Sequence, residues 1–306
     1  MSRGSDYIRA RFLERSSLLA PDQESLDLIN RVHSSWRDGA EPLSMDDVAA
    51  SATFADAEPG RYLQEIAEVA TRLTSAVIEA QFGYQPTQSM NAISGEVAEG
   101  EWIVHLDEHL RVFLFAFCVN RALRIYGNLD SAQASETKHL ALLLIDGFFQ
   151  PSSHFDIHKE MIWAFSYDED ITQIGHNVSN AILCFIFAHE LAHIVLKHRS
   201  GSDQTIEFEA DRLALEVFFH LVEERDYLEW TGIPTLYDCA PLILFDIRAL
   251  LDRHRISRGG RQSDETHPPP AMRLTRLQDI GAGRFSEDGR DLRDAFHGSL
   301  DELLPS

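Results

Sequence analysis

Two histidines and a glutamate stand at the spacing that metal-dependent hydrolases use. His189-Glu190-Leu191-Ala192-His193 is a HExxH motif, and residues four apart on an α-helix lie on one face. Both imidazoles can therefore bind one zinc ion, with Zn–N distances of about 2.0–2.1 Å. Glu190 lies about 100° round the helix, where its carboxylate can take a proton from a metal-activated water without being a ligand. The motif alone is a weak signal, and a buried helix with hydrogen-bonded histidines is the alternative.

Carboxylates follow the motif at a distance that lets them complete a site. A turn at residues 200–203 allows a second helix, predicted from Ile206 to Tyr227, to fold back antiparallel to the first. Glu207 can then supply the third ligand of a His2Glu site whose fourth position stays open for water. Asp211 lies one turn further on the same face and can accept a hydrogen bond from a ligand histidine. Glu209 lies on the opposite side and is the less favoured ligand.

A third element completes a pattern found in known enzymes. HPPPAMR, at 267–273, follows HELAH at 189–193 and EFEAD at 207–211. Together they resemble the HExxH, ExxAD, HPxxxxR pattern of gluzincin-type zinc metallopeptidases related to the CAAX prenyl endopeptidases. The membrane-embedded members of that group differ from this chain, in which no membrane helices are predicted, and the soluble Lit-type phage-exclusion proteases are the better match in size and in likely location. The resemblance covers about residues 170–280.

The resemblance implies a function and a role for each motif residue. The chain is expected to be an endopeptidase that binds Zn²⁺, with a role in bacterial defence against phage. Glu190 is expected to be the general base and proton shuttle, and Asp211 to orient a ligand histidine. His267 and Arg273 are expected either to support the site or to stabilise the oxyanion of the transition state. The implied zinc ligands are His189, His193 and Glu207.

Other families and functions stay open at this point. The short gap between His193 and Glu207 also resembles ImmA/IrrE-type proteases, although these typically have Asn where Asp211 stands. A zinc-bound or degenerate regulatory protein that cleaves nothing is the main alternative, and hydrolysis of a non-peptide amide is another. Glu190 argues against a purely structural metal site, which has no need of that carboxylate.

Other residues that could do chemistry carry weaker signals. His105-Leu106-Asp107-Glu108-His109 spells the inverted HxxEH motif. That motif is expected to be followed by a distant glutamate on a further helix, and no comparable helix carries one here. These residues are therefore predicted to form a strand end and a helix cap. Four further histidines are expected on the surface, although the two that flank the motif helix, His176 and His198, could line the cleft. Neither tyrosine hydroxyl is selected as an oxyanion donor. These residues are His154, His158, His176, His198, Tyr167 and Tyr237.

The apolar spacing predicts a mostly α fold (α+β with a small sheet): a zincin-like helical metallopeptidase core with an N-terminal helical part. Helices are expected over residues 22–37 and 60–81. Glu101–Leu106 favours a strand, and Asp107 is expected to cap a helix that ends near Tyr126. Ala181–Leu196 is apolar on almost all sides, as in a buried helix.

The remaining elements are less sharply defined. Leu140–Phe149 is ambiguous between strand and helix, and Met161–Phe165 is a second strand candidate. Either strand candidate, Glu101–Leu106 or Met161–Phe165, could bind substrate by strand addition. Helices are predicted over about Leu236–Leu251 and from Pro268 to Leu277, followed by an acidic tail.

Glycines and a proline between residues 83 and 100 suggest a boundary. The predicted division is an N-terminal helical region of unassigned function, 1–95, and a zinc metallopeptidase domain, 100–306.

The composition of the chain limits the classes of partner that it is expected to bind and the compartment in which it is expected to function. The net charge of −22 disfavours binding to nucleic acid or to anionic membranes, and the basic cluster Arg253–Arg261 is interpreted as a solvated loop. Cys118, Cys184 and Cys239 have no paired spacing, which fits buried thiols in a reducing compartment. No signal peptide and no run of about 18–20 apolar residues is recognised. A cytoplasmic protein with a protein or peptide substrate is expected.

Overall fold

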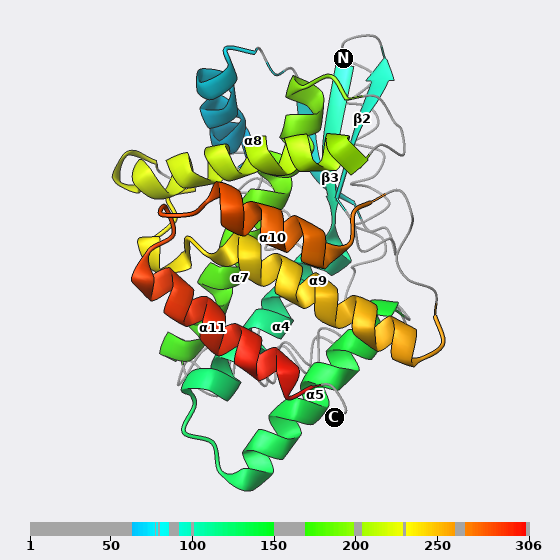
Figure 1. Ribbon diagram of the computed structural model, residues 1–306, viewed down its shortest axis with the longest axis vertical. Coiled ribbons are helices and arrows are strands. Elements are labelled where there is room, and N and C mark those ends of the chain that lie inside the picture. Colours follow the sequence, from blue (N-terminus) through cyan, green and yellow to red (C-terminus); the bar gives the residue numbers. More distant parts are fainter. Residues whose placement is uncertain are drawn as a thin grey trace, which may run out of the picture.

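The computed structural model describes residues 63–76, 78, 80–85, 92–98, 101–149, 169–198, 204–228, 231–260 and 267–303. Most of these residues are helical, and one small sheet stands at one end of the molecule (Figure 1). The prediction of a mostly α fold is therefore confirmed. The helix predicted over 22–37 and the strand predicted at 161–165 lie outside the described residues, as do His154, His158 and Tyr167.

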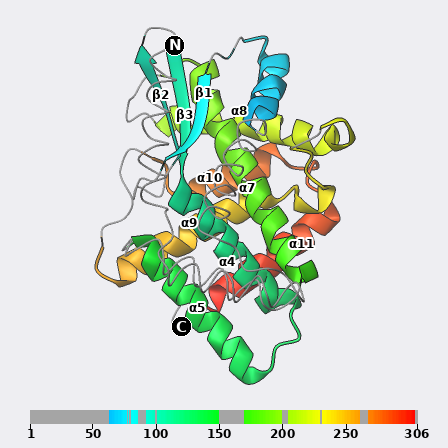
Figure 2. The same cartoon turned by 180° about the vertical axis from the view of Figure 1, so that it is seen from behind.

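The sheet has three strands in the order β1-β3-β2 (Figure 2). β3, Glu101–Asp107, is the central strand and matches its prediction to within a residue. β1, Ala80–Gln85, pairs with it in parallel, and β2, Ala92–Ala98, pairs with it antiparallel. The register places Ala92 opposite Leu106 and Ser94 opposite Val104.

β1 and β2 were not predicted. The helix expected over 60–81 occupies residues 63–74 and stops at Ser75, whose φ of 57° is incompatible with continuing a right-handed helix. Gly83, Pro86 and Gly95 favour a loop in isolation, but pairing with β3 gives the backbone its partners. The predicted division of the chain at 95–100 therefore passes through the sheet.

Seven long helices follow the sheet in the described residues. Their bounds are α4 Glu108–Tyr126, α5 Ser131–Phe149, α7 Glu169–Val195, α8 Gln204–Glu223, α9 Ala240–Ser257, α10 Pro270–Ile280 and α11 Glu287–Asp301. As predicted, Asp107 caps α4 by accepting a hydrogen bond from the His109 amide, and Gly127 ends it. The ambiguous segment Leu140–Phe149 is the second half of α5. The region predicted as an acidic tail contains α11, which buries Leu292, Phe296 and Leu300.

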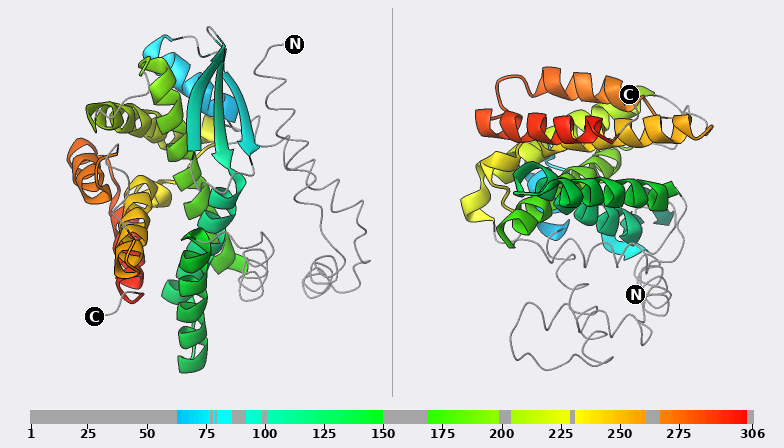
Figure 3. Two further views of the ribbon diagram at one scale, coloured as in Figure 1. Left: turned by 90° about the vertical axis from the view of Figure 1, so that its right-hand side faces the viewer. Right: turned by 90° about the horizontal axis from the view of Figure 1, so that it is seen from below.

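α7 is the central element of the fold. It packs against α4, α8, α9 and the sheet, and in the left view of Figure 3 the sheet lies on one side of it while α9, α10 and α11 lie on the other. α7 crosses α4 at Gly175, where a Cβ would come within 2.4 Å of the Val119 Cα. A glycine is therefore required at this crossing, and the close contact fixes α7 against the rest of the core.

The same helix contradicts the expectation that no segment is long and apolar enough to span a membrane. Within the described residues, the segment Asp170–Val195 is long and apolar enough by length and composition. In the fold, 72% of its most apolar stretch is buried. Its apolar character is therefore accounted for by packing against the surrounding helices.

Candidate metal centre

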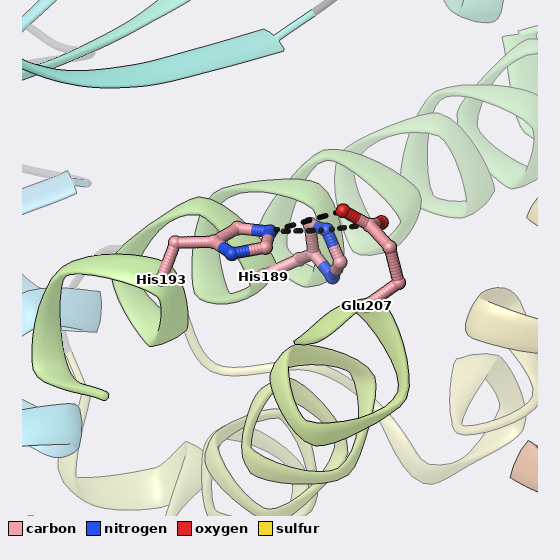
Figure 4. Close-up of side chains that lie close together, drawn as sticks. All are labelled: His189, His193 and Glu207. Carbon is pink, nitrogen blue, oxygen red and sulfur yellow. Dashed lines mark hydrogen bonds and ion pairs between the residues drawn. The ribbon is translucent and has the colours of Figure 1, made fainter. Parts of the chain in front are cut away.

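The structure brings together the three residues predicted as metal ligands. His189 and His193 project from the C-terminal part of α7, and Glu207 projects toward them from the first turn of α8 (Figure 4). The two Nε2 atoms are 3.1 Å apart. The Glu207 carboxylate oxygens lie 3.5 Å from the Nε2 of His189 and 3.6 Å from the Nε2 of His193.

These separations fit a small divalent ion. Ligand atoms about 2.0–2.1 Å from a tetrahedral zinc stand about 3.3 Å from one another, close to the three measured distances. Glu207 Oε2 is buried and makes no hydrogen bond within the described part of the chain. Its nearest donors, Arg273 Nη1 at 3.4 Å and His189 Nε2 at 3.5 Å, are beyond ordinary hydrogen-bond length. The His-His-Glu group can hold a metal ion.

A buried ion-pair network supports His189. Its Nδ1 lies 3.0 Å from Asp211 Oδ1, so Asp211 is in the position predicted for orienting a ligand histidine. Arg273 on α10 donates two hydrogen bonds to Asp211, from Nη2 to Oδ1 at 2.6 Å and from Nε to Oδ2 at 2.7 Å. Three helices, α7, α8 and α10, are thereby joined behind the ligand group.

The network distinguishes between the two roles left open for Arg273. The guanidinium of Arg273 is engaged by Asp211, contacts Glu207 and lies 4.6 Å from the centre of the Phe245 ring. These contacts favour a supporting role over an oxyanion donor. His267 lies at the solvent side, with Nε2 3.7 Å from Glu207 Oε1 and 51% of its side chain exposed.

Burial and neighbouring charges shift the pKa values of all three ligand residues. Burial lowers the pKa of His189, but Asp211 and Glu207 outweigh it and raise this pKa to about 9. Burial and the neighbouring charge on His189 lower the pKa of His193 to about 3. Burial raises the pKa of Glu207, but contact with His189 and Arg273 outweighs it and brings the pKa to about 2. A metal ion bound by the two Nε2 atoms would displace any proton held there.

Glu190 is held by a residue that the sequence did not single out. The Ser94 hydroxyl on β2 donates a hydrogen bond of 2.8 Å to Glu190 Oε2. This contact joins the predicted general base on α7 to the strand that packs beside that helix. Ser94 was missed because β2 itself was not recognised.

Of the two strands predicted to receive substrate, Glu101–Leu106 is not an edge strand, and Met161–Phe165 lies outside the described residues. Glu101–Asp107 is the centre of the sheet and is paired on both sides, so it has no open edge for strand addition. Among the described strands, β1 and β2 form the edges, and β2 is the one that carries Ser94.

The inverted motif and Tyr237 make contacts of their own, outside the ligand group. Asp107 bonds the ring of His109 at 2.9 Å as well as its amide, as expected for a strand end and helix cap. The Tyr237 hydroxyl accepts a hydrogen bond from Asn177 on α7. Asn177 is about 18 Å along that helix from His189 at 1.5 Å per residue. Tyr237 is therefore not an oxyanion donor at this site.

A histidine and a glutamate near the ligand group, His198 and Glu209, contact each other. His198, expected on the helix surface or lining the cleft, has a side chain that is only 9% exposed and contacts His193. Glu209, the less favoured ligand, is not part of the His-His-Glu group and bonds His198.

No family model, curated protein sequence or solved structure is significantly similar to this chain. Function is therefore inferred from the geometry of the site.

Proposed function

We propose that this protein is a zinc-dependent endopeptidase. One observation carries the proposal: Glu190 projects from the helix that bears both histidine ligands, and Ser94 holds its carboxylate. A purely structural zinc site usually has four protein ligands, whereas catalytic sites have three and an open position. Among the described residues, the ligand group has three members, His189, His193 and Glu207, which supports a site of the second kind.

The donor set supports zinc as the ion. Two imidazole nitrogens and one carboxylate are a common zinc set in hydrolases, whereas calcium and magnesium favour oxygen ligands. Asp211 accepts a hydrogen bond from His189 Nδ1 and leaves Nε2 to face the ion. The zincin-like character of the core rests on the same arrangement, two ligands on one helix and the third on the next.

The chain's own residues supply the proton transfers of peptide hydrolysis. Zinc held by the group supplies a Lewis acid for the scissile carbonyl and acidifies a water molecule. Glu190 takes a proton as the water oxygen adds to the carbonyl carbon, and it passes that proton to the amine nitrogen as the C–N bond breaks. Ser94 bonds one carboxylate oxygen of Glu190 and so fixes its direction. Arg273 and Asp211 keep His189 in place throughout.

β2 suggests how a peptide is presented. A strand edge can add an extended peptide by main-chain hydrogen bonds, and β2 connects through Ser94 to Glu190. A peptide paired with β2 would therefore run beside the base. The cytoplasmic location of the protein stays a prediction. Its part in defence against phage, which the resemblance implies, also stays a prediction.

Metal-dependent cleavage tests the proposal. Zinc-loaded protein is incubated with a denatured bacterial proteome, and new peptide N-termini are counted by mass spectrometry. We expect new termini that disappear with phenanthroline and return when zinc is added back, because hydrolysis needs the metal. Cleavage that continues unchanged after chelation would contradict zinc dependence. A fully zinc-loaded protein that produces no new termini would favour the non-cleaving regulatory alternative.

A further inference from the structure

The turn that ends α7 folds back onto a predicted metal ligand. Lys197 has a left-handed backbone, with φ at 54°. Its amide bonds the Ile194 carbonyl at 3.1 Å, and the His198 amide bonds the His193 carbonyl at 2.9 Å. This is the Schellman arrangement, in which the residue after the left-handed one comes to lie against the residue five positions earlier.

In most such turns that contact is apolar, but here it joins two imidazoles. His193 Nδ1 and His198 Nδ1 are 3.0 Å apart, and the rings meet edge to face, with centroids 5.2 Å apart. The other ring nitrogen of His198, Nε2, lies 3.2 Å from Glu209 Oε2 on α8. The His198 side chain is 9% exposed and that of Glu209 is 53% exposed.

The direction of the protons in this chain follows from its ends. The Glu209 carboxylate only accepts hydrogen bonds, so His198 donates through Nε2 and keeps a lone pair on Nδ1. That lone pair can accept only from a proton on His193 Nδ1. His193 Nε2, which faces His189 and Glu207, is then left with its lone pair free for a metal.

We propose that His198, held by Glu209, is the positioning residue for His193. It fixes the tautomer and the ring direction of this ligand, as Asp211 does for His189. The inference rests on the metal site of the proposed function, but not on what that site hydrolyses. Partners of this kind typically contribute about 10- to 100-fold to metal affinity.

Zinc affinity tests this role separately from activity. The dissociation constant is measured by competition with a chromophoric chelator for wild type and His198→Phe, which keeps a ring but removes the acceptor. We expect affinity to fall about 10- to 100-fold in the variant. The melting temperature of the metal-free protein is expected to stay close to wild type, because the backbone bonds of the turn are unchanged.

Two further variants make the test specific. His198→Asn places an acceptor oxygen near the position of Nδ1, so we expect it to retain more affinity than His198→Phe. His220→Phe is the matched control, because His220 pairs with Glu224 on α8 at 3.3 Å but does not contact the ligand group. It should bind zinc as wild type does.

Three outcomes would overturn the role of His198 or the metal site on which it rests. Affinity of His198→Phe within about twofold of wild type would overturn the proposal. A loss of affinity with a matching fall in the metal-free melting temperature would also overturn it, since His198 would then act on folding. Wild-type protein that binds no zinc at all would instead remove the metal site, and with it the proposed function, before any variant is compared.

Discussion

Replacing Glu190 with Gln is expected to abolish peptide hydrolysis while zinc stays bound. The amide has the size of the carboxylate and can still accept the hydrogen bond from Ser94, but it cannot take a proton from water. Loss of a general base typically costs about 10²- to 10⁴-fold in rate. The rate at which new peptide termini form is measured at equal zinc content for the two proteins.

A second Glu→Gln substitution serves as the control. Glu216 on α8 bonds Arg284 at 2.7 Å at an exposed position and does not contact the ligand group. Glu216→Gln should cleave like wild type. Full activity in Glu190→Gln with zinc bound would contradict the assignment of Glu190 as the base.

Replacing Arg273 with Ala is expected to have the largest effect on folding. It leaves the buried Asp211 carboxylate without its two strongest hydrogen bonds. Removing one partner of a buried ion pair costs about 3–5 kcal/mol in the free energy of unfolding. Urea denaturation of the metal-free protein measures this loss, and weaker zinc binding should accompany it because Asp211 no longer holds His189.

Arg284→Ala is the comparison for Arg273. Arg284 also bonds two carboxylates, on Glu216 and Glu223, but these lie at an exposed surface. Exposed ion pairs contribute about 0–1 kcal/mol, and its stacking on Phe219 adds a similar amount. An Arg273→Ala protein that is no less stable than Arg284→Ala would show that the network behind the ligands is not essential to the fold.

The ligand group could be predicted because helical periodicity determines most of it. His189 and His193 are one turn apart on a helix that the apolar residues around them already indicate, and Glu207 lies in the first turn of the next helix. Asp211 then follows on the same face, where the structure has it bonded to His189. Local sequence is enough for these placements because each depends on one helix and one short turn.

The supporting residues depend on contacts that sequence spacing does not show. Ser94 reaches Glu190 only because β2 pairs with a strand that follows it, and Gly95 weakens the strand signal. His198 reaches His193 through a left-handed residue, Lys197, that is not the glycine usually found there. α11 is a different case, since Leu292, Phe296 and Leu300 recur every four residues and the pattern was present to be read.

The zinc content of purified wild-type protein beside His193→Ala tests the central claim most directly. Both proteins are reconstituted with zinc, freed of excess metal and measured by elemental mass spectrometry. Because His193 is one of three ligands, we expect about one zinc per chain in wild type and almost none in the variant. Wild-type protein without zinc after reconstitution, or equal zinc in both proteins, would contradict the metal centre described above.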